Sequence, residues 1–89
     1  MALFPLGHVV ATPGALDVLE RSGTPPFCLL SRHQRGDWGE LDPEDVRENE
    51  LSLRSGFRLL SAYTVAGQKL WIITEADRSA TTILMPEEY

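Results

Sequence analysis

The chain has 89 residues, of which 43% are hydrophobic and 24% are charged, and its formal net charge is −5. This length falls below the usual range for two domains, and the composition is that of an ordinary folded domain rather than a disordered tail. The acidic balance argues against a general nucleic-acid binder, because such proteins carry a basic surface that neutralises phosphates.

The sequence carries no recognisable targeting or anchoring signal. No apolar run approaches the roughly 20 residues that span a bilayer, and residues 1–5 lack the charged start and long apolar stretch of a signal peptide. Cys28 is the single cysteine, so one chain offers neither an internal disulfide nor a multi-thiolate zinc site. We therefore expect a cytoplasmic protein that has no metal and no cofactor.

The first part of the chain predicts an extended segment followed by a helix. His8–Ala11 is rich in β-branched residues and lies between a glycine and a proline, which is typical of a short strand or of an extended lead-in. Thr12 and Pro13 then form an N-cap followed by proline at the first helical position. The apolar periodicity ends at Gly23, so a helix is expected over residues 13–22.

A second helix is predicted by the same kind of start signal. It opens at Thr24-Pro25-Pro26 and ends in a basic turn before Gly36, where cations suit the negative end of the helix dipole. Cys28 lies in the apolar run of this helix and is expected to be a small core residue.

The third helix has the clearest boundaries. Asp42 is an N-cap followed by Pro43, and the helix is expected to run to Ser55 with Gly56 as its left-handed stop. Its apolar stripe is narrow and includes Asn49, so most of its surface is expected to face water.

The last third of the chain has the two-residue period of strands. Arg58–Val65 and Lys69–Ala76 are separated by Ala66-Gly67-Gln68, a short link that fits a hairpin. Asp77-Arg78-Ser79 forms the next turn, and Ala80–Met85 completes a meander.

The expected fold class is therefore α+β, with a single domain over residues 1–89. About three short helices precede a three-stranded antiparallel meander, to which the segment 8–11 adds an N-terminal strand in one of its two interpretations.

The middle strand of the meander is apolar on both sides. Trp71 and Ile73 point to one side, and Leu70 and Ile72 point to the other. Helices in so small a domain cover only one face of the sheet, so the second apolar face needs a loop, a protein partner or a second copy of the chain. These four residues form the predicted interaction surface, and the pattern leaves open which side is uncovered.

A first group of polar candidates follows the second helix. His33 lies four residues before Asp37, and an imidazole beside a carboxylate can act as a general base. Capping of the helix C-terminus explains His33 equally well. Trp38 belongs to the unit Gly36–Gly39, which is expected to form a tight turn that Trp38 pins to the core.

A second polar group surrounds the last turn of the meander. Glu75, Asp77 and Arg78 bring two carboxylates and a guanidinium together, a composition that can bind a metal or a polar ligand. The alternative is a structural turn closed by Asp77, with Arg78 in an ion pair.

Acidic residues are concentrated around the third helix. The stretch from residue 37 to residue 50 holds seven carboxylates and one basic residue, Arg47, and therefore carries a charge of −6. The rest of the chain sums to +1. Such a stretch is typical of a solvated helix face, and it also fits a protein that mimics DNA by spacing carboxylates like phosphates.

Several segments resemble a family of small bacterial proteins carried on plasmids and integrative elements and described as plasmid-related. They are Gly36–Gly39, Arg58–Tyr63, Trp71–Thr82 and Leu84–Tyr89. The resemblance covers nearly the whole chain, and Trp71–Thr82 is its most specific part. It implies an accessory protein of a mobile genetic element, and it brings no activity that can be assigned to individual residues.

Three functions are consistent with these observations. The preferred hypothesis is a non-enzymatic protein–protein interaction module, with a second copy or another protein as its partner. One alternative is a small hydrolase or nuclease that uses Asp37, Glu75 and Asp77, together with His33. The other alternative is an acidic DNA mimic that inhibits a host restriction or defence enzyme.

Overall fold

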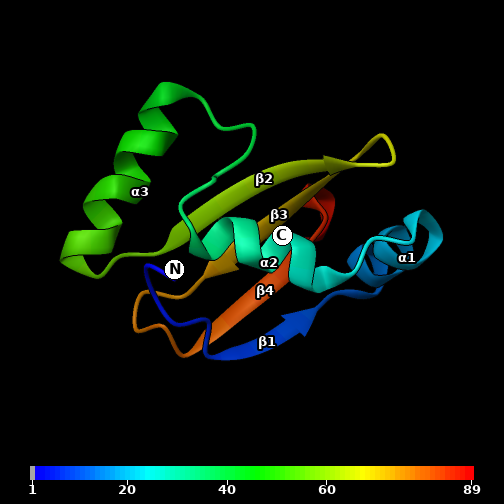
Figure 1. Ribbon diagram of the computed structural model, residues 1–89, viewed down its shortest axis with the longest axis horizontal. Helices are drawn as coiled ribbons and strands as arrows, with labels where there is room; N and C mark the ends of the chain where they lie inside the picture. Colours follow the sequence, from blue (N-terminus) through cyan, green and yellow to red (C-terminus); the bar gives the residue numbers. More distant parts are fainter. Residues whose placement is uncertain (1) are drawn as a thin grey trace.

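In the computed structural model, which describes residues 2–89, three helices and a four-stranded mixed sheet form the fold (Figure 1). The elements in chain order are β1 (His8–Ala11), α1 (Pro13–Ser22), α2 (Pro26–Gln34), α3 (Pro43–Ser55), β2 (Leu59–Val65), β3 (Gln68–Thr74), β4 (Ala80–Leu84) and the 3-10 turn η1 (Pro86–Glu88). The predicted α+β class, with helices before an antiparallel meander, is confirmed. Over the described residues, no helix has the length and apolar character needed to cross a membrane.

The strands lie in the order β1-β4-β3-β2. The meander β2-β3-β4 is antiparallel throughout, as predicted, and β1 joins the free side of β4 in a parallel arrangement that places Val9 opposite Thr81. The segment 8–11 is therefore a strand. Parallel neighbours need a crossover connection, and here the three helices and strands β2 and β3 all lie between β1 and β4 in the sequence.

Local capping explains why α1 and α3 have the predicted boundaries. The hydroxyl of Thr12 accepts a hydrogen bond from the backbone N–H of Ala15 at 3.3 Å, and the carboxylate of Asp42 accepts one from Asp45 N–H at 2.9 Å. At the far end of α3, Gly56 adopts a left-handed φ of 75°.

The inward face of α2 differs from the prediction. Cys28 is exposed, and Phe27 keeps 73% of its surface accessible to solvent. Because α2 begins at Pro26, the buried stripe consists of Leu29 and His33, which lie one turn apart on the helix. Cys28 therefore lies outside the core.

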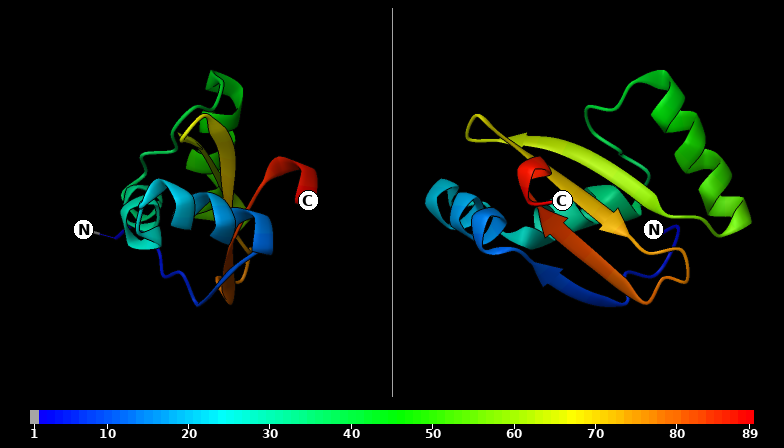
Figure 2. Two further views of the ribbon diagram at one scale, coloured as in Figure 1. Left: turned by 90° about the vertical axis from the view of Figure 1, so that its right-hand side faces the viewer. Right: turned by 180° about the vertical axis from the view of Figure 1, so that it is seen from behind.

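Helices α1 and α2 cover one face of the sheet, and η1 lies on the opposite side (Figure 2). The core between these helices and the sheet consists of Ala15, Val18, Leu19, Leu29, Tyr63, Val65, Leu70, Ile72 and Ile83. Leu70 and Ile72 have no accessible surface, so this side of β3 belongs to the core.

A second, smaller core lies beneath α3. Phe4, Trp38 and Leu59 form its centre, and Val46 and Leu53 of α3 pack against them. The rings of Phe4 and Trp38 are stacked at 6.3 Å. Trp38 thus pins its loop to the core, as predicted, while α3 needs only a narrow apolar stripe to join the fold.

Asn49 of α3 closes the outer edge of β2. Its side-chain amide donates to the carbonyl of Leu60 at 2.6 Å and accepts from the N–H of the same residue at 3.1 Å. Further along the edge, Ala62 N–H donates to Trp38 O at 3.0 Å and Glu40 N–H donates to Ala62 O at 2.7 Å. An unpaired strand edge is a template for association, so α3 and its preceding loop shield this one.

We expect Asn49→Ala to lower the free energy of unfolding by about 2–4 kcal/mol, because it leaves two backbone groups of Leu60 without partners. Urea unfolding followed by circular dichroism measures this loss. Glu48→Ala, on the exposed side of the same helix, is the control and should change stability by less than about 0.5 kcal/mol. Equal effects of the two substitutions would contradict the proposed closure of the edge.

A candidate interaction surface on the sheet

The strand register determines which residues share the face that α1 and α2 leave uncovered. Ala62 lies opposite Trp71, Leu60 lies opposite Ile73, and Trp71 lies opposite Leu84 across the other ladder. Since directly opposed residues point to the same side, these five side chains form one apolar surface, here called the Trp71 face. Trp71 and Ile73 of the predicted surface belong to it, whereas Leu70 and Ile72 lie in the core on the other side. Within the Trp71 face, Trp71 and Leu60 are partly accessible, and Ala62, Ile73 and Leu84 are buried.

The C-terminal turn η1 is held across this face by Glu88. The Glu88 carboxylate accepts hydrogen bonds from the Thr12 hydroxyl at 2.5 Å, from Gly14 N–H at 3.0 Å and from Met85 N–H at 2.9 Å. The Thr12 hydrogen bond is the main reason why the pKa of Glu88 lies below its ordinary value. A carboxylate at the start of α1 is also favoured by the helix dipole, so the turn is attached to a rigid element.

Tyr89 covers part of the Trp71 face. Its ring meets the indole of Trp71 edge-on, with centroids 5.9 Å apart. Arg58 donates to the Tyr89 hydroxyl at 3.0 Å and forms an ion pair with Glu75 at 3.3 Å. Tyr89 itself remains 70% exposed, so the aromatic pair is open to solvent on its outer side.

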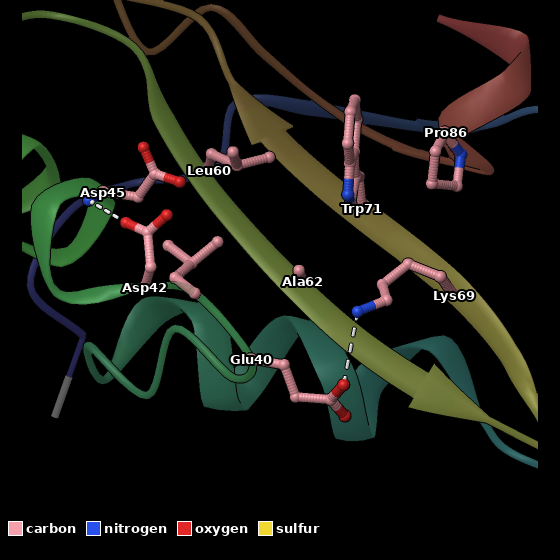
Figure 3. A pocket seen from close by; sticks show the side chains of 9 residues that line it. Glu40, Asp42, Asp45, Leu60, Ala62, Lys69, Trp71 and Pro86 are labelled. Carbon is pink, nitrogen blue, oxygen red and sulfur yellow. Dashed lines mark hydrogen bonds and ion pairs between the residues drawn. The ribbon is translucent and has the colours of Figure 1, made fainter.

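Two hollows flank Trp71. The larger, of about 550 Å³, lies between the start of α3 and η1 and is lined by Glu40, Leu41, Asp42, Asp45, Leu60, Ala62, Lys69, Trp71 and Pro86 (Figure 3). The smaller, of about 250 Å³, is lined by Arg58, Leu59, Leu60, Trp71, Ile73 and Tyr89. Figure 3 shows the indole standing up from β3 as a wall of the larger hollow.

The larger hollow, here called the acidic hollow, combines an apolar floor with a charged rim. Glu40 accepts hydrogen bonds from the Thr64 hydroxyl at 2.9 Å and from Lys69 Nζ at 3.3 Å. The Thr64 bond is the larger cause of the lowered pKa of Glu40. Asp42 and Asp45 complete the rim, so three carboxylates and one ammonium group surround the floor.

His33 lies in the core, which differs from both of its predicted roles. It has no accessible surface, its Nδ1 lies 2.5 Å from the Ser61 hydroxyl, and its Nε2 lies 2.9 Å from the Thr74 hydroxyl. Burial lowers its pKa to about 4. The imidazole is therefore neutral near pH 7, and both of its nitrogens bind neighbouring side chains within the fold.

Asp37 is paired with Arg32 rather than with His33. Its carboxylate accepts from Arg32 Nε at 2.7 Å, and this contact is the main cause of its lowered pKa. The neighbouring Trp38 is 4% exposed and donates from Nε1 to Glu50 at 3.3 Å. Both residues thus organise the loop between α2 and α3.

The second polar group also stabilises local structure. Asp77 accepts from Ser79 N–H at 3.0 Å and closes the turn between β3 and β4. The guanidinium of Arg78 donates to four backbone carbonyls, those of Ser52, Phe57, Glu75 and Ala76. Arg78 therefore joins this turn to the C-terminal end of α3 through carbonyls, where the sequence suggested an ion pair.

The polar candidates are therefore distributed over separate contacts. Asp37 is bound to Arg32, Glu75 to Arg58 and Asp77 to its own turn. Within residues 2–89, no group of three or more His, Cys, Asp or Glu side chains is arranged to hold a metal ion.

The sequence analysis did not identify most of the residues around Trp71. A two-residue turn at Ala66-Gly67 would have placed two of them, Leu60 and Ala62, on the same face as Trp71. Ala66 and Gly67 both have positive φ values, 49° and 77°, which is the signature of a two-residue hairpin turn. A two-residue turn pairs residue 65 with residue 68 and so places Ala62 opposite Trp71 and Leu60 opposite residue 73. The three-residue link assumed from the sequence concealed this register.

Comparisons of the chain with protein-family models, with curated proteins and with solved structures found no match.

Proposed function

We propose that this protein is a non-enzymatic interaction module that binds a protein partner through the Trp71 face. The observation that carries the proposal is the half-buried indole of Trp71 between two hollows, on the sheet face that α1 and α2 leave uncovered. Protein interfaces draw most of their binding energy from a few central residues, and Trp is among the most frequent of them.

The contacts of the polar residues favour binding over the hydrolase or nuclease alternative. A catalytic assembly needs a nucleophile or base with access to substrate. The buried His33 and the internally paired Asp37 instead stabilise the α2 end of the fold, and Arg78 joins a turn to α3. The side chains of Trp71 and Leu60 on the Trp71 face remain partly accessible to solvent and take part in no comparable set of polar contacts.

The biological context of the proposal comes from the resemblance described above. An accessory protein of a bacterial mobile element acts in the cytoplasm, where proteins of the host or of the element itself are the available partners. The proposal thus places a small binding module on a plasmid or integrative element.

We expect Trp71→Ala to weaken partner binding at least about 30-fold, the loss typical of a central aromatic residue. Short peptides selected from a random display library on the immobilised protein provide the probe, and fluorescence polarisation gives their dissociation constants. Phe27→Ala is the matched control, because it also removes an exposed aromatic ring, and should change affinity less than about threefold. Circular dichroism verifies that both variants are folded.

Peptides that bind wild type and Trp71→Ala equally well would overturn the proposal. Light-scattering chromatography of the same two proteins tests whether the occupant is a second copy. A dimer that dissociates on Trp71→Ala would assign the face to self-association.

A further inference from the structure

We infer that the partner segment that binds the Trp71 face carries Lys or Arg next to an apolar residue. The apolar residue packs on the face, and the basic side chain lies beside the carboxylates of Asp42 and Asp45. The inference rests on the proposed function and adds the chemistry of the partner to it. Its basis is the unequal distribution of charge around the acidic hollow.

The charges on the rim of this hollow do not cancel. Lys69 forms an ion pair with Glu40, so these two side chains largely neutralise each other. The other ion pairs within residues 2–89 involve Asp17, Asp37 and Glu75, and Asp42 and Asp45 take part in none of them. The hollow therefore presents two carboxylates whose charges are not compensated by a basic side chain.

The two carboxylates lie beside the apolar floor. Figure 3 shows Asp42 and Asp45 at the start of α3, with Leu60 and Ala62 between them and the indole of Trp71. Asp42 uses Oδ1 to cap α3, which fixes its position on the rim. An apolar side chain seated on Leu60 and Ala62 beside Trp71 brings its flanking residues to this rim, where a cation gains favourable electrostatic energy.

Charge also makes a second copy of the chain a poor occupant. Each copy carries a net charge of −5, so two copies repel each other over most approaches. A nucleic acid is repelled for the same reason. A basic and apolar protein segment complements both the floor and the rim.

Two double variants distinguish the contribution of the rim carboxylates to binding from that of the overall negative charge of α3. Asp42→Asn/Asp45→Asn neutralises the rim, and Asn retains the N-cap of the helix. Glu44→Gln/Glu48→Gln removes the same amount of charge from exposed positions of the same helix that do not line the hollow. Both variants raise the net charge by two units.

The test uses the random display library on wild type and on both double variants. Peptides selected by wild type are expected to be enriched in Lys or Arg beside an aliphatic or aromatic residue. Their affinity should fall about tenfold in Asp42→Asn/Asp45→Asn and less than about twofold in Glu44→Gln/Glu48→Gln. Binding to wild type should also weaken as salt is added.

The outcomes distinguish this inference from the function on which it rests. Peptides that need Trp71 but lack basic residues would overturn the inference and leave the proposed function intact. Basic peptides that bind independently of Trp71 and lose affinity equally in both double variants would overturn both, and would favour the DNA-mimic alternative. Selection of no peptide, together with a concentration-dependent dimer, would replace the basic segment with a second copy.

Discussion

The free energy of unfolding is expected to fall by about 3 kcal/mol as the pH is lowered from about 7 to about 4, because His33 is buried in its neutral form. Burial holds the pKa of His33 at about 4, against an ordinary value of 6.5. Each unit of pKa difference corresponds to about 1.4 kcal/mol. For a domain of this size, such a loss is a large share of total stability.

A chain of hydroxyl groups determines which nitrogen of the neutral imidazole carries the proton. Thr81 donates its hydroxyl proton to the carbonyl of Leu6 at 2.7 Å, so Thr74 must donate to Thr81 across their 2.8 Å contact. Because the Thr74 hydroxyl donates to Thr81, its oxygen must act as the acceptor in the contact with His33, and Nε2 of His33 therefore carries the proton. Nδ1 is then unprotonated and accepts a hydrogen bond from the Ser61 hydroxyl. A second proton on Nδ1 would face the Ser61 hydroxyl and force it to give up its role as donor.

The sign of the pH effect depends on whether the folded or the unfolded chain protonates His33 first as the pH is lowered. The unfolded chain protonates His33 near its ordinary pKa, whereas the folded chain resists protonation until about pH 4. The stabilisation is therefore fully present above about pH 6.5 and is lost as the pH falls toward 4. The lowered pKa values of Asp37, Glu40, Asp77 and Glu88 also stabilise the fold, and this contribution begins to be lost only as the pH falls to their ordinary values of 3.8 to 4.5. The decline between about pH 6.5 and 4.5 is therefore assigned to His33.

Urea unfolding at a series of pH values measures the slope, and His33→Gln is the control. Glutamine offers an amide NH2 group as donor and a carbonyl oxygen as acceptor but does not titrate, so the decline between about pH 6.5 and 4.5 should become shallower in the variant. A direct NMR titration of the wild-type imidazole gives a second reading that does not depend on the variant folding. An imidazole that gains its proton near pH 6.5 in the native state would contradict the buried, neutral assignment.

The helices could be predicted where their signals are local. Thr12 and Asp42 act as the N-caps that the sequence indicated, and Gly56 ends α3 as expected. The orientation of α2 could not be derived in the same way, because Cys28 and Leu29 are both apolar neighbours. Only packing against α1 and the sheet determines that Leu29 turns inward.

The candidate site was predictable to a smaller extent. The apolar character of β3 on both sides indicated that one face would need a partner, but Leu70 and Trp71 are equally hydrophobic candidates. The helices decide between them by covering Leu70. The environment of His33 could not be predicted for another reason. Its hydrogen-bond partners Ser61 and Thr74 lie 28 and 41 residues away along the chain.

Gly39→Ala is expected to lower the free energy of unfolding by about 4 kcal/mol or more, the second large effect in this fold. A Cβ atom at this position would overlap the backbone carbonyl of Ala62 and would lie 2.7 Å from the Tyr63 ring. The close approach exists because Gly39 bridges to β2 at Ala62, with the hydrogen bond from Glu40 N–H beside it. Relief of the overlap requires movement of the backbone, and strain of this kind belongs to the upper range of single substitutions.

Gly56→Ala isolates the steric part of this cost. Gly39 and Gly56 share a φ of 75°, so a left-handed alanine is disfavoured by about 1–2 kcal/mol at either position. A Cβ on Gly56 meets no atom within 4 Å, and its substitution should cost no more than this conformational term. Chemical denaturation of the two variants measures the difference, and equal losses would contradict the close packing of the loop on β2.

Because the same bridge positions Glu40 on the acidic hollow, a folded Gly39→Ala variant should also bind basic peptides more weakly than Gly56→Ala does.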